Sequence, residues 1–210
     1  MKKYQLKKHL RLLMKRFQRK KKKENKDINI LNIIDSEIKG NSIRQGFSKG
    51  IQSYSQKLDK IDYTSHKDLT HIPFVTIDGQ NSKDFDDAVF AEVNNEKIKI
   101  LVAIADVSFF VKKGDPIDLE ARKRGNSFYF PDRVIPMLPE ILSNNICSLI
   151  PNQIRASLVC EIILQNTKII KYKFHRAKIL SRARLTYKEV DEIYKNNRKN
   201  EISKLVDNLF

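Results

Sequence analysis

The pattern of apolar and polar residues predicts a mixed sheet in the middle of the chain. Phe74–Ile77 and Ala88–Val93 are short runs of β-branched and aromatic residues, and an Asn94–Asn95 turn separates the second run from a third at Lys97–Ala105. The alternate positions of this third run are apolar on both faces: Ile98, Ile100, Val102 and Ile104 on one, Leu101, Ala103 and Ala105 on the other. We therefore expect it to be a central strand that is covered on both sides.

A helix and an irregular segment are predicted after these strands. Asp115 is suited to an N-cap, Pro116 to the first helical position, and Gly125 to the end of the helix. Residues 126–139 carry too many prolines for a central strand and too many aromatic residues for an ordinary solvent loop. The predicted fold class is α/β, with helices beside a mixed α+β sheet.

The first 71 residues differ from the rest of the chain in the pattern of their charged and apolar residues. Residues 1–23 contain no acidic residue, and apolar residues recur at helical spacing between lysines and arginines, which predicts a basic amphipathic arm over residues 1–27. Such an arm could contact RNA phosphates, lie on an anionic membrane, direct the chain to an organelle, or be solvated without a specific role. Residues 28–71, with Gly40, Gly46 and Gly50, are predicted to be a linker with an apolar patch and a short helix near Gly50–Leu58. The ordered domain is expected over residues 72–210.

The composition indicates which kind of partner and which cellular compartment to expect. The net charge is +16, which indicates a polyanionic partner, either nucleic acid or an anionic membrane surface. No apolar run is long enough to span a bilayer, and no secretory signal pattern is present, so a cytoplasmic protein is expected. Cys147 and Cys160 form no CxxC pair, and the four histidines lack zinc-ligand spacing.

Four aspartates within ten residues are the strongest candidates for chemistry. Asp78, Asp84, Asp86 and Asp87 lie between two predicted strands, where a sheet can hold several carboxylates in place. Crowded carboxylates repel one another unless they are solvated, protonated or neutralised by a cation. Magnesium prefers such oxygen ligands, whereas the spacing does not match a calcium-binding EF-hand loop. A plain solvated acidic turn is the alternative.

Five motifs follow one another along the chain: Thr76–Gly79 with Asp84–Ala88, Val102–Ser108, Gly125–Glu140, Leu142–Asn144 with Cys147–Leu149, and Ala183–Tyr187. Taken in this order, they resemble the catalytic domain of the ribonuclease II and ribonuclease R family, the RNB domain. The match runs from Ile72 to about Tyr187 and is similar to the first half of that domain, with Tyr129–Arg133 in the form typical of ribonuclease R.

The resemblance implies a magnesium-dependent 3′-to-5′ exoribonuclease that hydrolyses single-stranded RNA to nucleoside 5′-monophosphates. Asp78, Asp84 and Asp87 would hold Mg²⁺, or Mn²⁺ in the same oxygen cage, and Asp86 would be catalytic by positioning a second ion or the attacking water. Tyr129 would stack on the terminal nucleotide, and Arg133 in the same motif would contact RNA.

The chain also departs from the family pattern. Family members usually carry cold-shock barrels before this domain and another RNA-binding barrel after it, and the resemblance implies that these 210 residues include neither. It also implies that they stop before a later segment that would supply an arginine and a glutamate to the site, so a truncated or split chain is expected. Two hypotheses follow. The chain is either an impaired or split ribonuclease, completed by a separately encoded remainder, or a noncatalytic RNA-binding remnant.

Overall fold

The computed structural model describes residues 30–59, 62–196 and 201–209, which form two compact units. The first consists of Met1–Gln45 with Tyr129–Val134, and the second of Gly46–Phe128 with Ile135–Phe210. In the first, helix α2 (Ile30–Gly40) buries Ile34 and Ile38. The predicted basic arm at residues 1–27 lies outside the described residues. No helix among the described residues is long and apolar enough to cross a membrane.

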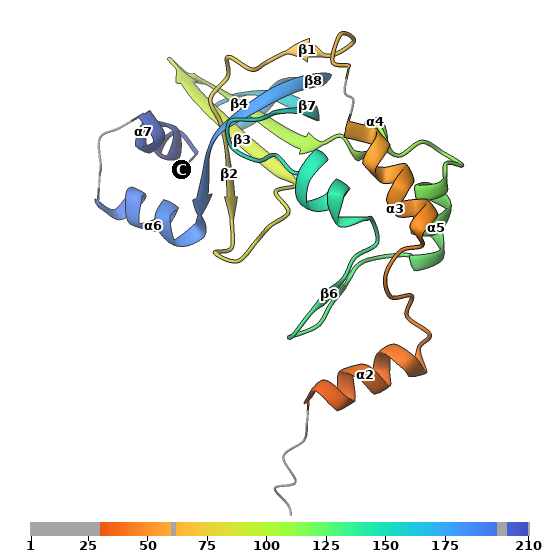
Figure 1. Cartoon of the computed structure of the whole chain (residues 1–210). Coiled ribbons are helices and arrows are strands. Elements are labelled where there is room, and N and C mark those ends of the chain that lie inside the picture. The colour runs from red at the N-terminus through yellow and green to blue at the C-terminus, as the bar shows by residue number, and fades with distance from the viewer. Residues whose placement is uncertain (1–29, 60–61, 197–200, 210) are drawn as a thin grey trace, which may run out of the picture. The chain divides into compact units, whose positions relative to one another are not determined.

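A six-stranded mixed sheet forms the centre of the second unit (Figure 1). The strands lie in the order β1-β8-β2-β3-β4-β7, where β8 runs parallel to β1 and β2 and the other neighbours are antiparallel. Their bounds are β1 Lys67–Asp68, β2 Phe74–Asp78, β3 Asp87–Asn94, β4 Lys97–Ala105, β7 Ile154–Gln165 and β8 Lys168–Thr186. The sheet confirms the predicted mixed α/β fold class.

The long strand β8 joins the two edges of the sheet. Its first part pairs with β7 from Lys168 to Leu180, and its last part pairs with β2 from Ser181 to Thr186. The strand pairing therefore closes on itself, and β7 is paired on both sides over most of its length. A two-residue turn at Asn166–Thr167, both with positive φ, links β7 to β8 and suits the twist of an antiparallel hairpin.

Helices cover the two faces of the sheet unequally. On one face, α3 (Lys49–Gln56), α4 (Val107–Phe110), α5 (Pro116–Arg124) and the π-helix Leu142–Ile146 enclose the larger core around Phe74, Leu101 and Val159. A 3₁₀ turn, Lys57–Asp59, follows α3, and the short pair β5 (Phe128–Tyr129) and β6 (Val134–Ile135) follows α5. As predicted, α5 is capped by Asp115 and ended by Gly125 at φ 80°.

On the opposite face, α6 (Tyr187–Asn196) and α7 (Glu201–Asp207) form a smaller core. Val190, Leu205 and Val206 pack there against Val75 of β2 and Leu185 of β8. These two helices lie over β2, β3 and the end of β8, and they leave most of β4 uncovered. The prediction that Lys97–Ala105 is covered on both sides is therefore wrong, since Ile104 is 47% exposed.

Candidate active site

The four aspartates lie at one end of the sheet, around the connection between β2 and β3. Asp78 is the last residue of β2 and Asp87 the first of β3. Because these strands are antiparallel neighbours, both residues are at the same sheet end, and Asp84 and Asp86 lie in the loop between them. The fold thus brings the four predicted site residues into one region.

Backbone hydrogen bonds fix the second half of this loop. The amide of Ala105 donates to the Asp86 carbonyl oxygen at 2.8 Å, and the amide of Leu149 donates to the Phe85 carbonyl at 2.8 Å. The Phe85 amide in turn donates to the buried hydroxyl of Ser148 at 2.9 Å. The half-buried Phe85 ring packs against the larger core, so the residues on both sides of it are held in place.

Arg184 fixes the first half of the loop. It lies opposite Thr76 in the register of β8 and β2, and its Nη2 donates to the carbonyl oxygens of Gly79 and Gln80 at 2.8 and 2.7 Å. Its guanidinium lies 5.7 Å from the centre of the Phe85 ring, and its Nε is buried and has no hydrogen-bond partner among the described residues. One side chain therefore holds the turn after Asp78.

The aspartates interact through their charges. Burial, followed by the charge of Asp87, raises the pKa of Asp78, and the Arg184 guanidinium only partly offsets this rise. Partial loss of solvent, with the charges of Asp84 and Asp87, raises the pKa of Asp86. Both shifts have the sign expected where carboxylates share a site without a neutralising cation.

The donor set fits a hard divalent cation, although the carboxylates do not form a closed cage. In the part of the chain that the structure describes, no three His, Cys, Asp or Glu side chains are grouped closely enough to hold a metal ion by themselves. Magnesium does not require such a group, because it is usually bound by one or two carboxylates together with waters and substrate phosphates. The arrangement suits an ion that binds together with a phosphate-bearing ligand.

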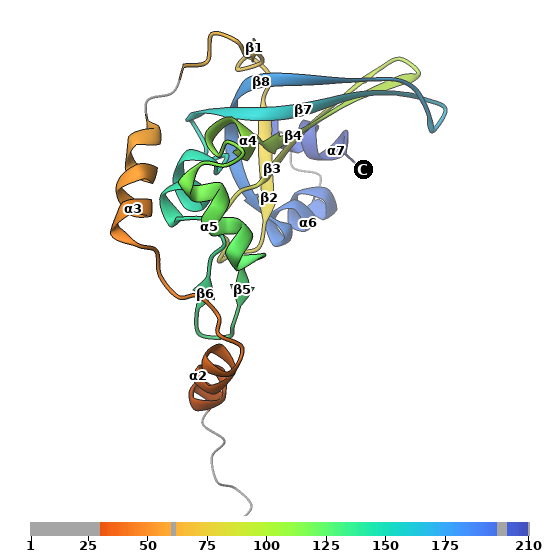
Figure 2. The same cartoon turned by 90° about the vertical axis from the view of Figure 1, so that its right-hand side faces the viewer.

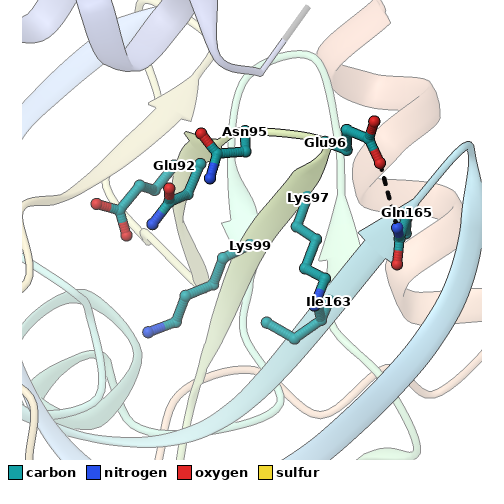
Figure 3. Close-up of a pocket in the computed structure, with 8 residues that line it drawn as sticks. Glu92, Asn95, Glu96, Lys97, Lys99, Ile163 and Gln165 are labelled. Carbon is teal, nitrogen blue, oxygen red and sulfur yellow. Dashed lines mark hydrogen bonds between the residues drawn. The ribbon is translucent and has the colours of Figure 1, made fainter.

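Two cavities of similar size lie on the second unit. One, of about 520 Å³, adjoins the site, and its lining includes Asp78, Gly79, Arg184, Tyr187 and Lys188. The other, of about 550 Å³, lies at the tip of the β3–β4 hairpin, where Lys97 and Lys99 extend beside Ile163 and Glu96 accepts a hydrogen bond from Gln165 (Figure 3). It contains none of the four aspartates.

Tyr129 and Arg133 belong to the other unit. The Tyr129 side chain is 71% exposed, and the Arg133 guanidinium pairs with Asp35 at 3.0 Å and with Asp132 at 2.7 Å. The hydrogen bond that Arg133 donates to the Asp132 carboxylate is the largest cause of the raised Arg133 pKa. Their predicted RNA contacts stay predictions.

Ser148 and Arg184 were not predicted as site residues. Both are in motifs that carry the family resemblance, but they are 63 and 105 positions from the residues that they hold. No local spacing signals such contacts, because the pairing of β8 with β2 and the position of the π-helix create them.

Comparison with known proteins assigns the family. The RNB domain model matches residues 66–209. Ribonuclease R of Buchnera aphidicola subsp. Schizaphis graminum is 46% identical over 149 residues, which are 69% of this chain and 20% of that protein. The chain thus spans about a fifth of the length of this curated relative.

Solved structures agree with this assignment. RNase R of Mycoplasma genitalium, in complex with ribose methylated single-stranded RNA, aligns with a TM-score of 0.79 and 33% identity over 87% of this chain and 30% of its own. Yeast Ssd1, described as a pseudonuclease, shares the fold at a TM-score of 0.56 and 18% identity, over 70% of this chain and 17% of its own. The chain belongs to the RNB domain family and is similar to its ribonuclease R members.

Proposed function

We propose that the chain is the aspartate-bearing part of a 3′-to-5′ exoribonuclease that hydrolyses single-stranded RNA in the cytoplasm. The observation that carries this proposal is the group of four charge-coupled aspartates at one sheet end of an RNB domain. The similarity to ribonuclease R proteins, one of them solved with single-stranded RNA, supports the choice of substrate.

Each aspartate has a proposed role. Asp78, Asp84 and Asp87 hold Mg²⁺, which Mn²⁺ could replace, and the exposed Asp86 accepts a hydrogen bond from the attacking water and orients it. A bound ion of this kind makes water more acidic and neutralises the phosphate. Ser148 and Arg184 keep the aspartates in position by fixing the loop backbone.

The bond changes follow from the products. The water oxygen forms a bond to the last phosphorus of the RNA, and the bond from that phosphorus to the preceding 3′-oxygen breaks. The released nucleotide keeps a 5′-phosphate, and the shortened RNA ends in a 3′-hydroxyl. Repetition of this step gives nucleoside 5′-monophosphates.

The test is degradation of a 5′-labelled single-stranded RNA by the full chain with Mg²⁺. A ladder that shortens from the 3′ end is expected, with a rate that falls at least about 100-fold in Asp86→Asn and is lost with a chelator. Glu96→Gln, at the tip of the β3–β4 hairpin, is the matched acidic control and should keep the wild-type rate. A wild-type rate in Asp86→Asn would contradict the role of Asp86.

A second candidate function is RNA binding without cleavage. The net charge of +16 favours it, because lysines and arginines bind the phosphates of RNA whether or not cleavage follows. Intact RNA retained in a salt-sensitive complex would be its signature. A separately encoded remainder of the ribonuclease would restore cleavage if the chain is one part of a split enzyme.

A further inference from the structure

The start of β7 supports the loop that carries Asp84 and Asp86. One support is the hydrogen bond from the Ala105 amide to the Asp86 carbonyl oxygen, and the next amide in the chain, that of Asp106, donates to the Ala156 carbonyl at 3.0 Å. Ala105 is the last residue of β4, and β7 lies between β4 and β8 in the sheet (Figure 2). This support therefore belongs to the backbone of the sheet and needs no side chain.

The second support, at Phe85, lies outside the sheet. The Phe85 amide and carbonyl bond to Ser148 and Leu149, which follow the π-helix and precede β7. These two residues are not part of a strand, so contacts other than a β-ladder set their position. The position of Ser148 therefore decides where Phe85 lies, and with it the aspartates on either side.

One arginine fixes the segment after the π-helix. Arg155, the second residue of β7, is 8% exposed, and its Nε donates to the Ser148 carbonyl oxygen at 3.0 Å. Its Nη1 donates to the Ile154 carbonyl at 3.2 Å. Its Nη2 donates to the side-chain oxygens of Asn145, at 3.3 Å, and of Gln153. The planar guanidinium thus joins the π-helix, the segment after it and the start of β7.

Other contacts of Ser148 and its neighbour support this position. The Ser148 carbonyl oxygen also accepts a hydrogen bond from the Ile150 amide at 2.8 Å, so both lone pairs of that oxygen are used. The π-helix before it is a kind of turn found often at functional sites. Burial and the charge of Asp86 raise the pKa of the Cys147 thiol to about 12, and the charge of Arg155 opposes this rise. Arg155 and Asp86 thus act on the same thiol, beside Ser148.

The burial of Arg155 also bears on its role. Removing a guanidinium from water costs free energy that its hydrogen bonds must offset, and an apolar side chain of similar volume would avoid this cost. Such a side chain has no donor for the Ser148 carbonyl. The choice of arginine at this position therefore favours the contact with Ser148 over the filling of core volume.

We propose that Arg155 is a positioning residue for the metal-binding aspartates, acting through Ser148 and Phe85 on Asp84 and Asp86. The proposal rests on the proposed function for the roles of these aspartates, whereas the position of the loop is a property of the metal-free chain. Metal ligands have to be held within about 0.5 Å of their productive positions, and hydrogen-bonded neighbours of the ligands provide this. Arg155 needs no contact with RNA for this role.

The first test measures amide hydrogen exchange in the full, metal-free chain. In Arg155→Lys, the Phe85 amide should exchange at least about tenfold faster, because an ammonium cannot reproduce the planar set of bonds that holds Ser148. The amide of Leu101, in the middle of β4, reports opening of the whole fold and should change less than that of Phe85. Equal acceleration at Leu101 and Phe85 would mean a merely structural arginine and would overturn the proposal.

A second buried arginine supplies the matched control. Arg124 is 9% exposed, and its guanidinium bonds to the carbonyl oxygens of Gly46 and Pro136 instead. Arg124→Lys should therefore leave the exchange of the Phe85 amide at the wild-type rate. The same acceleration at Phe85 in both arginine variants would overturn the proposal.

The second test asks whether Arg155 acts through Ser148. Ser148→Ala already frees the Phe85 amide, so adding Arg155→Lys should accelerate its exchange by less than about twofold more. Two effects that multiply in full would overturn this connection. Gln153→Ala, which removes one acceptor of the guanidinium, decides the matter if Arg155→Lys does not fold. It should accelerate the same amide, and an unchanged rate would contradict the proposal.

The third test measures binding of Mn²⁺ alone by electron paramagnetic resonance. Arg155→Lys should weaken the affinity at least about tenfold, as loss of a group that orients metal ligands does. Arg124→Lys should keep the wild-type affinity. Wild-type affinity in Arg155→Lys would overturn the positioning role. If the wild-type chain itself binds no Mn²⁺, the proposed function fails, and the exchange of the Phe85 amide decides whether Arg155 fixes the loop.

Discussion

Ser148 couples the aspartate loop to the core. Its hydroxyl is fully buried and is the acceptor for the Phe85 amide, while the next amide in the chain, that of Leu149, donates to the Phe85 carbonyl. Both polar groups of the Phe85 backbone are thus satisfied by residues 148 and 149. These hydrogen bonds hold the backbone at Phe85 and thereby restrict the positions of Asp84 and Asp86 on either side of it.

We expect Ser148→Ala to destabilise the protein by about 1–3 kcal/mol, because it leaves a shielded amide without an acceptor. Urea unfolding followed by circular dichroism would measure the change. Ser143→Ala, in the π-helix that precedes Ser148, is the control, since its hydroxyl donates to the side chain of the neighbouring Asn144. Equal stability losses in the two variants would show that the Phe85 contact contributes nothing.

His66 is a second residue whose surroundings lead to a prediction, in this case of how stability depends on pH. Its ring is 6% exposed, lies edge-on to Phe109 with centres 4.6 Å apart, and contacts Tyr63. Burial lowers its pKa below the usual 6.5, with a smaller contribution from Arg176, against the opposing charges of Asp106 and Asp62. The folded state therefore favours the neutral ring.

This shift predicts how stability depends on pH. The folded-state pKa is below the unfolded one, so the contribution of the neutral ring is present above about pH 6.5 and is lost as the pH falls through the folded value. The urea midpoint should decrease between about pH 7 and pH 5. In His66→Phe that decrease should be smaller, and His71→Gln controls for the loss of a histidine. An unchanged slope in His66→Phe would contradict this account.

At the scale of elements, Arg124 connects α5 to two other segments. Its Nε donates to Glu120 at 3.0 Å, its Nη1 to the Pro136 carbonyl at 3.2 Å, and its Nη2 to the Gly46 carbonyl. The guanidinium also stacks 3.8 Å from the centre of the Phe47 ring. Arg124, in the basic last turn of α5, thus joins the helix to the segments at Gly46–Phe47 and Pro136.

Arg124→Lys should destabilise the protein by about 2 kcal/mol or more, because an ammonium cannot reproduce a buried, planar set of contacts. Arg122→Lys is the matched control on the same helix, where an exposed ion pair with Asp118 is worth less than about 1 kcal/mol. Thermal unfolding of both variants would compare them. A loss as large in Arg122→Lys would attribute the effect to helix charge instead.

At the scale of the whole molecule, the net charge of +16 predicts that the affinity for RNA depends on the salt concentration. Lysines and arginines that neutralise phosphates release counterions, so raising the salt from about 50 to 200 mM should lower the affinity at least about tenfold. Fluorescence anisotropy with a labelled single-stranded RNA would measure it. Removal of residues 1–27 should reduce the salt slope if the basic arm contacts phosphates. An unchanged slope would leave the arm without this role.

The incomplete helical cover of the sheet bears on the position of the candidate active site. One face of the sheet is enclosed by helices, while α6 and α7 cover only part of the other. The aspartates lie where the covered and uncovered regions of that second face meet, through Asp87 and its row on β3, β4 and β7. The candidate active site therefore lies beside exposed apolar residues of the sheet, Ile104 and Leu158.

The sequence alone determined the elements whose signals are local. The strands at Phe74–Asp78, Asp87–Asn94 and Lys97–Ala105 follow from β-branched residues and alternation, and the helix at Pro116–Arg124 from its cap and its terminal glycine. The four aspartates were found because they are crowded within ten residues. Such features act over a few positions, so no tertiary contact is needed to recognise them.

Only the tertiary structure decided what depends on distant segments. The β7–β8 hairpin was not predicted, because its Asn166–Thr167 turn lacks the glycine that usually marks two positive φ angles. The roles of Ser148 and Arg184 arise from contacts across 63 and 105 positions. The sequence pattern showed that both faces of β4 are apolar, but burial requires a covering element, and α6 and α7 end before they reach it.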